Sequence, residues 1–261
     1  MSLTYTLPQI YDIAFDFRDV KGEVDFLLDA FRKHTGREAR SAIEIACGPA
    51  YHVREIARRG LVADGLDLEP SMVNYARELI AREELDARIF EGDMRGFKAP
   101  RKYDLAFILL ASFGHLLTNQ DILDNFDCVS ELLADDGLYV IVTAHPRDFF
   151  AEEEPSLKTY WEMEREGIKV VTDWGGSNQQ FDPLTEIDDV VISFTVTQNG
   201  QTTRHEFPER LRRLSFQTFL ALVRLSGRFE IKDLLGDFDL GCRLSNAEES
   251  NRLLAVLGKL S

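Results

Sequence analysis

Residues 42–69, AIEIACGPAYHVREIARRGLVADGLDLE, decide the fold because they combine a strand, a tight turn, a helix and a second strand. Residues 42–46 are apolar apart from Glu44, which is typical of a parallel strand buried on both faces. Gly48 follows where the backbone must turn, and its missing Cβ lets a ligand approach closely. Residues 50–60 then place apolar side chains at helical spacing. These elements form half of a nucleotide-binding unit.

An acid ends the second strand of this stretch. Asp67 closes the strand predicted for residues 61–68, about 20 residues after the glycine turn, where a carboxylate can accept hydrogen bonds from ribose hydroxyls. The first-turn amide groups of the preceding helix point toward the same place. We therefore expect a ribose-bearing ligand. Pro49 and Ala50 depart from the G-x-G-x-x-G pattern of dinucleotide sites, so later residues must identify the ligand.

Two segments of the stretch resemble the first two motifs of the class I S-adenosylmethionine-dependent methyltransferases. They are Glu44-Ile45-Ala46-Cys47-Gly48-Pro49-Ala50 and Gly65-Leu66-Asp67-Leu68-Glu69-Pro70-Ser71-Met72. The resemblance runs from Tyr11 to Lys259, with residues 146–214 matched loosely, and Ala50 stands at the family's last glycine. It implies one α/β domain over residues 1–261, with a Rossmann-like, doubly wound seven-stranded sheet. That sheet would be mostly parallel, with one antiparallel strand near the C terminus.

The resemblance also implies the contacts of the cofactor, S-adenosylmethionine, and of its product, S-adenosylhomocysteine. The expected cofactor-binding residues are Tyr11, Glu44, Ala46, Cys47, Gly48, Pro49, Asp67, Leu68, Met72, Asp93, Met94 and Leu110. Tyr11-Asp12 would belong to a lid within residues 1–36 that closes over the methionine end. The Asp93 carboxylate would accept a hydrogen bond from the adenine amino group, because an ionised carboxylate only accepts. The five histidines lack a paired short spacing, so no metal site is expected.

The rest of the chain supplies the remaining elements of this fold. Apolar runs predict strands at residues 87–93, 103–110 and 138–143, and two further strands at 228–235 and 251–259. Between them, residues 146–214 alternate in the manner of strands and contain the turn signals Glu166-Gly167 and Asn199-Gly200. We expect an antiparallel insertion of four strands there, which would shape the acceptor site. Its small core would draw on Tyr160, Trp161, Trp174, Phe181 and Phe194.

A general base could come from one of two histidines. His115 lies in the loop after the fourth strand, at the carboxyl end where open parallel sheets bind ligands, so it is the catalytic candidate. His145 follows the fifth strand and is the second candidate. A structural role is the alternative for both. His52, beside the glycine turn, fits a partner of the site residues better than a catalyst.

Composition restricts the partners and the compartment. Lys and Arg total 30 against 45 Asp and Glu, a formal charge of −15 that repels phosphate backbones and anionic lipids, so nucleic acid and membranes are not expected partners. Three cysteines without metal or disulfide spacing favour reduced thiols and a cytoplasmic location. No leader and no apolar run near 18 residues long is evident.

The function expected from these features is direct, in-line methyl transfer to a nitrogen or oxygen of a small, neutral or cationic acceptor. One alternative is an NAD(P)-dependent oxidoreductase, in which Asp67 would hold the adenine ribose, although Pro49 and Ala50 weaken it. The other alternative is a protein that binds S-adenosylmethionine without catalysis. The free edge of the inserted sheet could also pair with a second subunit, which would give a homodimer.

Overall fold

The computed structural model describes residues 3–149, 159–175 and 180–260. Its main sheet has seven strands in the order β11-β12-β5-β4-β1-β2-β3. The strands are β1 (Ser41–Ile45), β2 (Val62–Asp67), β3 (Ala87–Glu91), β4 (Tyr103–Ile108), β5 (Leu133–Ala144), β11 (Phe229–Leu235) and β12 (Arg252–Lys259). Strand β12 is antiparallel to both β5 and β11, and the pairs formed by β1 to β5 are parallel. The predicted fold class is therefore confirmed.

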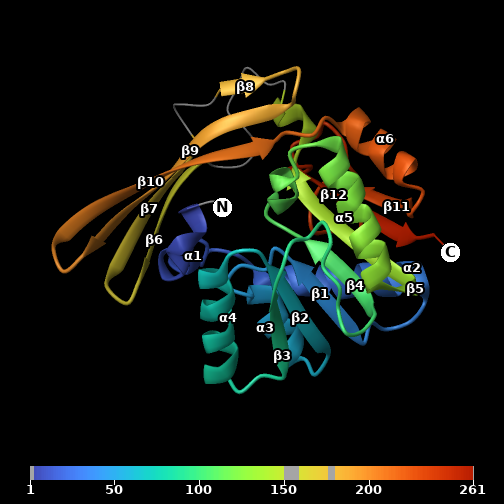
Figure 1. Ribbon diagram of the computed structural model, residues 1–261, viewed down its shortest axis with the longest axis horizontal. Helices are drawn as coiled ribbons and strands as arrows, with labels where there is room; N and C mark the ends of the chain where they lie inside the picture. The colour runs from blue at the N-terminus through green and yellow to red at the C-terminus, as the bar shows by residue number, and fades with distance from the viewer. Residues whose placement is uncertain (1–2, 150–158, 176–179, 261) are drawn as a thin grey trace.

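Helices cover both faces of this sheet (Figure 1). One face packs against α2 (Val20–Thr35), α3 (Tyr51–Arg58) and α4 (Pro70–Arg82), and the other against α5 (Asn119–Leu132) and α6 (Phe216–Ser226). Neighbouring residues of β1 point to opposite faces of the sheet. Ala42 belongs to the apolar cluster on the side of α2, α3 and α4, and Ile43 belongs to the cluster on the side of α5 and α6. This burial on both sides explains the unbroken apolar runs of the parallel strands.

Local sequence signals place the helix and hairpin ends. Thr118 accepts a hydrogen bond from the Asp121 amide at 3.0 Å, and Asp121 accepts one from the Thr118 amide at 2.9 Å, which forms the capping box of α5. Asn199 and Gly200 have φ angles of 51° and 75°, as a tight hairpin turn between twisted strands requires. These turns fix the register of the strands that follow.

A second, antiparallel sheet is inserted between β5 and α6. It contains β6 (Tyr160–Arg165), β7 (Ile168–Trp174), β9 (Ile187–Gln198) and β10 (Gln201–Arg212) in the order β10-β9-β7-β6, and short β8 (Gln180–Asp182) pairs with β9. The prediction of four strands missed β8, whose three residues are all exposed and give no burial pattern. Phe194 is buried as predicted, but Tyr160 and Phe181 are exposed, so the predicted core was wrong for these two residues.

The N-terminal segment lies under the second sheet. It contains η1 (Leu3–Thr6) and α1 (Pro8–Ala14), and α1 packs on β6, β7 and α4 (Figure 1). Tyr11, Ile13 and Phe15 are buried in a third apolar cluster with residues of β7, β9 and β10. The segment therefore connects the two sheets. In the part of the chain that the structure describes, no helix is long and apolar enough to cross a bilayer.

Candidate active site

The loops after β1 and β4 meet at the carboxyl edge of the main sheet and carry unusual backbone angles. Ala46, Gly48 and Ala50 after β1 have φ angles of 55°, 50° and 61°, and Leu110 and Ala111 after β4 have 53° and 58°. Non-glycine residues rarely take positive φ, and such strain gathers at ligand sites. Ala50 thus adopts the left-handed conformation that a glycine would take most easily. The loop therefore has this conformation although it has no glycine at position 50.

Asp67 fastens the glycine turn to the end of β2. Its Oδ2 atom accepts a hydrogen bond from the Gly48 amide at 2.7 Å, and its Oδ1 atom accepts one from the Glu69 amide at 2.9 Å. Burial raises the pKa of Asp67, while these two amide groups counteract that rise. The predicted acid is therefore placed beside the turn, with its carboxylate against the backbone that a ribose would approach.

A buried chain of charges extends behind the turn. His52 on α3 is fully buried, with Nδ1 2.8 Å from Glu44 Oε1 and Nε2 2.6 Å from Glu23 Oε2. Arg18 forms an ion pair of 2.5 Å with the same Glu23 carboxylate. Burial lowers the pKa of His52, but Glu44 and Glu23 outweigh it, so the pKa is raised overall. His52 thus links two acids at the site.

Among the linked side chains of Arg18, Glu23, His52 and Glu44, two polar atoms have no hydrogen-bond partner within the described residues. They are Oε2 of Glu44 and Nε of Arg18, and both are buried. Both side chains line a small cavity beside the glycine turn. A buried acceptor and a buried donor left open together suit the ammonium and carboxylate groups of an amino acid. The residues present therefore fit the methionine end of the expected cofactor.

Seven of the predicted cofactor-binding residues line the cavities at this edge. They are Tyr11, Glu44, Ala46, Cys47, Gly48, Pro49 and Leu110. Burial raises the pKa of the Cys47 thiol well above its usual range, so this group stays protonated and apolar. Sequence reasoning missed Arg18, which lies between two helices in a stretch without any motif.

The other predicted contacts lie outside these cavities. Leu68 is half exposed, and Met72 is buried beneath Tyr11 in the third apolar cluster. Asp93 follows β3, and Arg95 donates hydrogen bonds to both of its oxygens, from Nε at 2.9 Å and Nη2 at 2.6 Å. These bonds lower the pKa of Asp93, which keeps it ionised. The Met94 carbonyl accepts from Asn125 at 3.0 Å.

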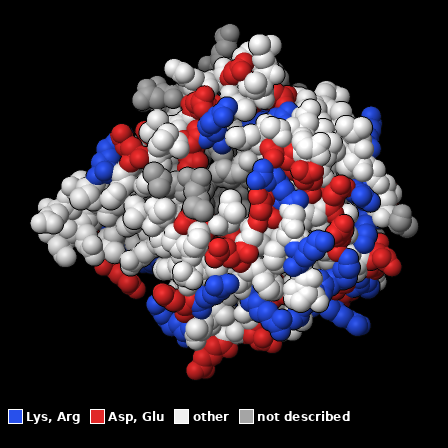
Figure 2. Space-filling view, viewed as in Figure 1, with Lys and Arg blue, Asp and Glu red and all other residues white. Residues whose placement is uncertain are grey.

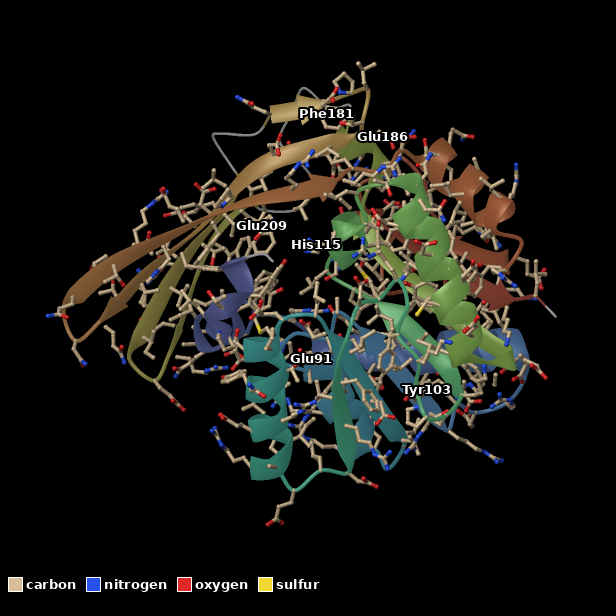
Figure 3. All side chains as sticks on the ribbon, in the orientation of Figure 1. Glu91, Tyr103, His115, Phe181, Glu186 and Glu209 are labelled. Carbon is tan, nitrogen blue, oxygen red and sulfur yellow. The ribbon has the colours of Figure 1, made fainter. Side chains whose placement is uncertain are left out.

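A large cavity of about 1480 Å³ opens between the main sheet and the second sheet. His115 lies on the main-sheet side of this cavity. Figure 3 shows it below the second sheet, near whose strands Glu186 and Glu209 are labelled. The Nε2 atom of His115 is 2.9 Å from the Tyr5 hydroxyl. Burial lowers the pKa of His115 to about 4, so the imidazole is neutral near pH 7 and can accept a hydrogen bond.

Both ring nitrogens of His145 form hydrogen bonds with backbone groups. Its Nε2 atom donates to the Ser245 carbonyl at 2.9 Å, and its Nδ1 atom accepts from the Arg147 amide at 3.1 Å. With both ring nitrogens engaged, it has no atom left for an acceptor. His115 therefore stays as the catalytic candidate. Within the described ranges, no group of three or more His, Cys, Asp or Glu residues could hold a metal ion.

Residues 42–137, which contain the glycine turn, Asp67, Asp93 and His115, match a family model described as a methyltransferase domain. This match identifies residues 42–137 as a methyltransferase domain. A curated relative of this chain is the dTDP-3-amino-3,4,6-trideoxy-alpha-D-glucopyranose N,N-dimethyltransferase of Streptomyces venezuelae. It is 28% identical over 134 residues, which cover 51% of this chain and 54% of the relative.

A second curated relative of the chain is the dTDP-3-amino-3,6-dideoxy-alpha-D-glucopyranose N,N-dimethyltransferase of Streptomyces fradiae, 27% identical over 52% of each chain. The chain thus spans about half the length of the curated relatives it matches. Among solved structures, Streptomyces venezuelae DesVI has a TM-score of 0.77 and 22% identity, and covers 97% of this chain and 98% of its own. This structural likeness extends the shared fold to the inserted sheet.

Proposed function

We propose that this protein transfers a methyl group from S-adenosylmethionine to the nitrogen of a small-molecule acceptor. The observation that carries the proposal is the arrangement at the carboxyl edge of the sheet. There the Asp67 carboxylate lies 2.7 Å from the Gly48 amide, next to the open polar atoms of Arg18 and Glu44. The two curated relatives named N,N-dimethyltransferases support nitrogen over oxygen.

Each part of the cofactor has a counterpart in the chain. Asp67 would accept from the ribose hydroxyls, Arg18 and Glu44 would hold the carboxylate and ammonium of the methionine end, and Asp93 would meet the adenine. Tyr11 would cover the sulfur end from α1. When bound, the sulfonium supplies an electrophilic methyl carbon with a neutral thioether as leaving group. The protein then needs chiefly to align the acceptor.

His115 would act on the acceptor itself. With Nε2–H donating to the Tyr5 oxygen, Nδ1 of the neutral imidazole would accept a hydrogen bond from the N–H of an amine and so aim the nitrogen lone pair at the methyl carbon. The lone pair forms the new N–C bond while the C–S electron pair returns to sulfur, and the extra proton on nitrogen leaves to solvent. Orientation of this kind can lower a barrier by about 7 to 11 kcal/mol.

The oxidoreductase alternative lacks a phosphate cradle at the glycine turn. Pro49 has no N–H, and the Ala50 amide already donates to the Cys47 carbonyl at 2.9 Å. Two of the amides that would hold a diphosphate are therefore not available. A protein that binds the cofactor without catalysis would share the site, so turnover must separate that alternative from the proposal.

We extend the proposal to the location and the assembly of the protein. The three cysteines are all free, which supports a reducing, cytoplasmic compartment. Strands β6 and β10 are the outer strands of the second sheet, and either could pair with a second copy to form a homodimer. On the face in Figure 2, acidic and basic side chains alternate rather than gather by sign, which suits a small-molecule acceptor better than nucleic acid.

Calorimetric titration with S-adenosylhomocysteine, and separately with NAD, tests the cofactor site. We expect micromolar binding of S-adenosylhomocysteine and none of NAD. Asp67→Ala should weaken that binding about 100-fold, because two charge-assisted hydrogen bonds are lost, while the exposed control Asp86→Asn should not change it. Binding of NAD, or of neither ligand, would contradict the proposal. Binding without methylation of any amine in a mass-spectrometric screen would favour the non-catalytic role.

A further inference from the structure

The second sheet contributes two ion pairs to the wall of the large cavity. The Nε atom of Arg213 donates to Asp188 Oδ2 at 2.7 Å. The Nη2 atom of Arg212 donates to Glu186 Oε2 at 2.9 Å and to Asn119 Oδ1 at 2.7 Å. Figure 3 shows Glu186 where the second sheet approaches the main domain. Because each guanidinium lies on a carboxylate, neither arginine gives the cavity an uncompensated positive charge.

Each of these ion pairs leaves one polar atom without a hydrogen bond to the described residues. The atoms are Oδ1 of Asp188 and Nη1 of Arg212. Both atoms are buried, and both residues line the cavity. An unsatisfied buried donor or acceptor destabilises the folded protein, and a bound ligand that makes the missing hydrogen bond removes this cost. Two residues of the cavity wall thus carry an acceptor and a donor that are not engaged within the described part of the chain. Hydroxyl groups satisfy both kinds.

The charges around the cavity are predominantly negative. Its described lining includes four arginines, Arg18, Arg212, Arg213 and Arg252, and seven acids, Asp19, Glu23, Asp148, Asp188, Asp237, Asp239 and Glu249. Each arginine pairs with a carboxylate: Arg18 with Glu23, Arg252 with Asp237 at 3.1 Å, and the other two as above. The lining therefore has three more acids than arginines. A wall of this sign repels phosphate and attracts an ammonium group.

Aromatic side chains form the wall below the second sheet. The Phe15 ring lies 5.4 Å from Trp161 and 5.5 Å from Trp174, in edge-to-face contacts. All three residues line the cavity. Aromatic faces bind both the apolar face of a ring and a cation. The cavity therefore combines aromatic surface, open hydrogen-bonding atoms and negative charge.

We propose that the acceptor is an amine on a hydroxylated scaffold that carries no phosphate, such as a free amino sugar or its simple glycoside. Its hydroxyls meet Asp188 and Arg212, and its ring lies on the aromatic wall. This inference rests on the proposed methyl transfer. It separates this protein from the curated relatives, whose names specify dTDP-linked sugars.

Two probes test the inference on the full chain saturated with S-adenosylhomocysteine. Methyl α-D-glucosaminide supplies the hydroxylated amine, and thymidine 5′-diphosphate supplies the phosphate charge. By calorimetry we expect the glucosaminide to bind at least about tenfold more tightly than the diphosphate. Equal or tighter binding of the diphosphate, or no binding of the glucosaminide, would overturn the inference. Failure of the protein to bind S-adenosylhomocysteine would instead overturn the proposed function beneath it.

A variant pair connects the binding to Asp188. Asp188→Asn should weaken glucosaminide binding about tenfold and leave the Kd for S-adenosylhomocysteine unchanged, while the exposed control Glu78→Gln changes neither. If Asp188→Asn does not fold, Asp239→Asn removes a charge from the same wall without breaking the Arg213 ion pair, and should weaken binding about threefold. Unchanged glucosaminide binding in the folded variant would exclude this wall as the acceptor site.

Discussion

The hydroxyl of Tyr5 lies 2.9 Å from Nε2 of His115, so the first helical turn of the chain touches the catalytic candidate 110 residues later. Both side chains are half-buried, and the desolvation of Tyr5 raises its pKa well above its usual range, so its hydroxyl stays protonated. This hydrogen bond ties the His115 imidazole to the N-terminal segment. The position of that segment and the placement of His115 are therefore coupled.

Removal of the His115 imidazole should slow catalysis without loss of the cofactor. We expect His115→Asn to lower kcat about 100-fold, because the acceptor nitrogen loses its positioning partner, while the Kd of S-adenosylhomocysteine changes less than about twofold. Tyr5→Phe should also lower kcat, by a smaller factor than His115→Asn. Stopped assays with an accepted amine measure kcat, and calorimetry measures the Kd. A full rate in His115→Asn would exclude it from catalysis.

The pH profile separates His115 from the acceptor. Because burial lowers the pKa of His115 to about 4, the imidazole is neutral throughout the range from pH 6 to 8. The rate should therefore fall toward low pH only as the acceptor amine gains its proton. The wild type and Tyr5→Phe should give the same apparent pKa in kcat/KM for one amine, and that pKa should move when an amine of different basicity is used. An invariant pKa near 6.5 would contradict this.

Arg18 and Glu44 should recognise only the amino acid end of the cofactor. 5′-Methylthioadenosine keeps the adenosine and the thioether but lacks the ammonium and carboxylate groups. Arg18→Gln should weaken S-adenosylhomocysteine binding about 30-fold, since one charged hydrogen bond is lost, and leave 5′-methylthioadenosine within about twofold. Glu44→Gln should do the same, and the exposed control Arg82→Gln should affect neither ligand. Equal weakening of both ligands would indicate a folding defect instead.

Asp93 should distinguish adenine from hypoxanthine. Its carboxylate only accepts, so it favours an amino group at C6 over a carbonyl. Asp93→Asn can also donate, and it should reduce the preference for S-adenosylhomocysteine over S-inosylhomocysteine about tenfold in competitive binding. Arg95→Gln serves as the comparison, because it frees Asp93 from its ion pair but keeps the acceptor, and it should preserve the preference. An unchanged preference in Asp93→Asn would place the base elsewhere.

The fold was predictable because its signals are local. The apolar run of β1, the glycine turn and Asp67 lie within 28 residues, and the hairpin residues Asn199 and Gly200 take the positive φ angles that their type favours. The capping box of α5 is equally local, because Thr118 and Asp121 are three residues apart. Periodicity and turn chemistry therefore suffice for the order and type of the elements.

The polar contacts of the site were not predictable, because they join distant segments. Tyr5 reaches His115, and Arg18 reaches His52, but neither Tyr5 nor Arg18 stands in a motif or at a telling spacing. Asp188 sits in an ordinary β strand, and only the fold brings it to the cavity wall. Side chains of this kind are identified by the partners they lack or share after folding.

The linked side chains of Arg18, Glu23, His52 and Glu44 should make the free energy of unfolding depend on pH, because His52 changes its charge. Its folded pKa is raised above the unfolded value of about 6.5, so its contribution is full below pH 6.5 and is lost as the pH rises through the folded pKa. His115 acts in the opposite sense, because its lowered pKa gives a contribution that is present above pH 6.5 and lost as the pH falls toward about 4. A variant is therefore needed to isolate the contribution of His52.

His52→Gln removes the imidazolium and leaves two buried acids without it. We expect a loss of about 3 kcal/mol in the free energy of unfolding at pH 6, the usual scale for a broken buried ion pair. The loss should shrink as the pH rises, because the wild type then loses the same charge. Urea unfolding of both proteins from pH 6 to 9, with His115→Asn as a parallel control, measures the difference. A gap that stays constant over this range would mean that His52 is neutral in the folded protein.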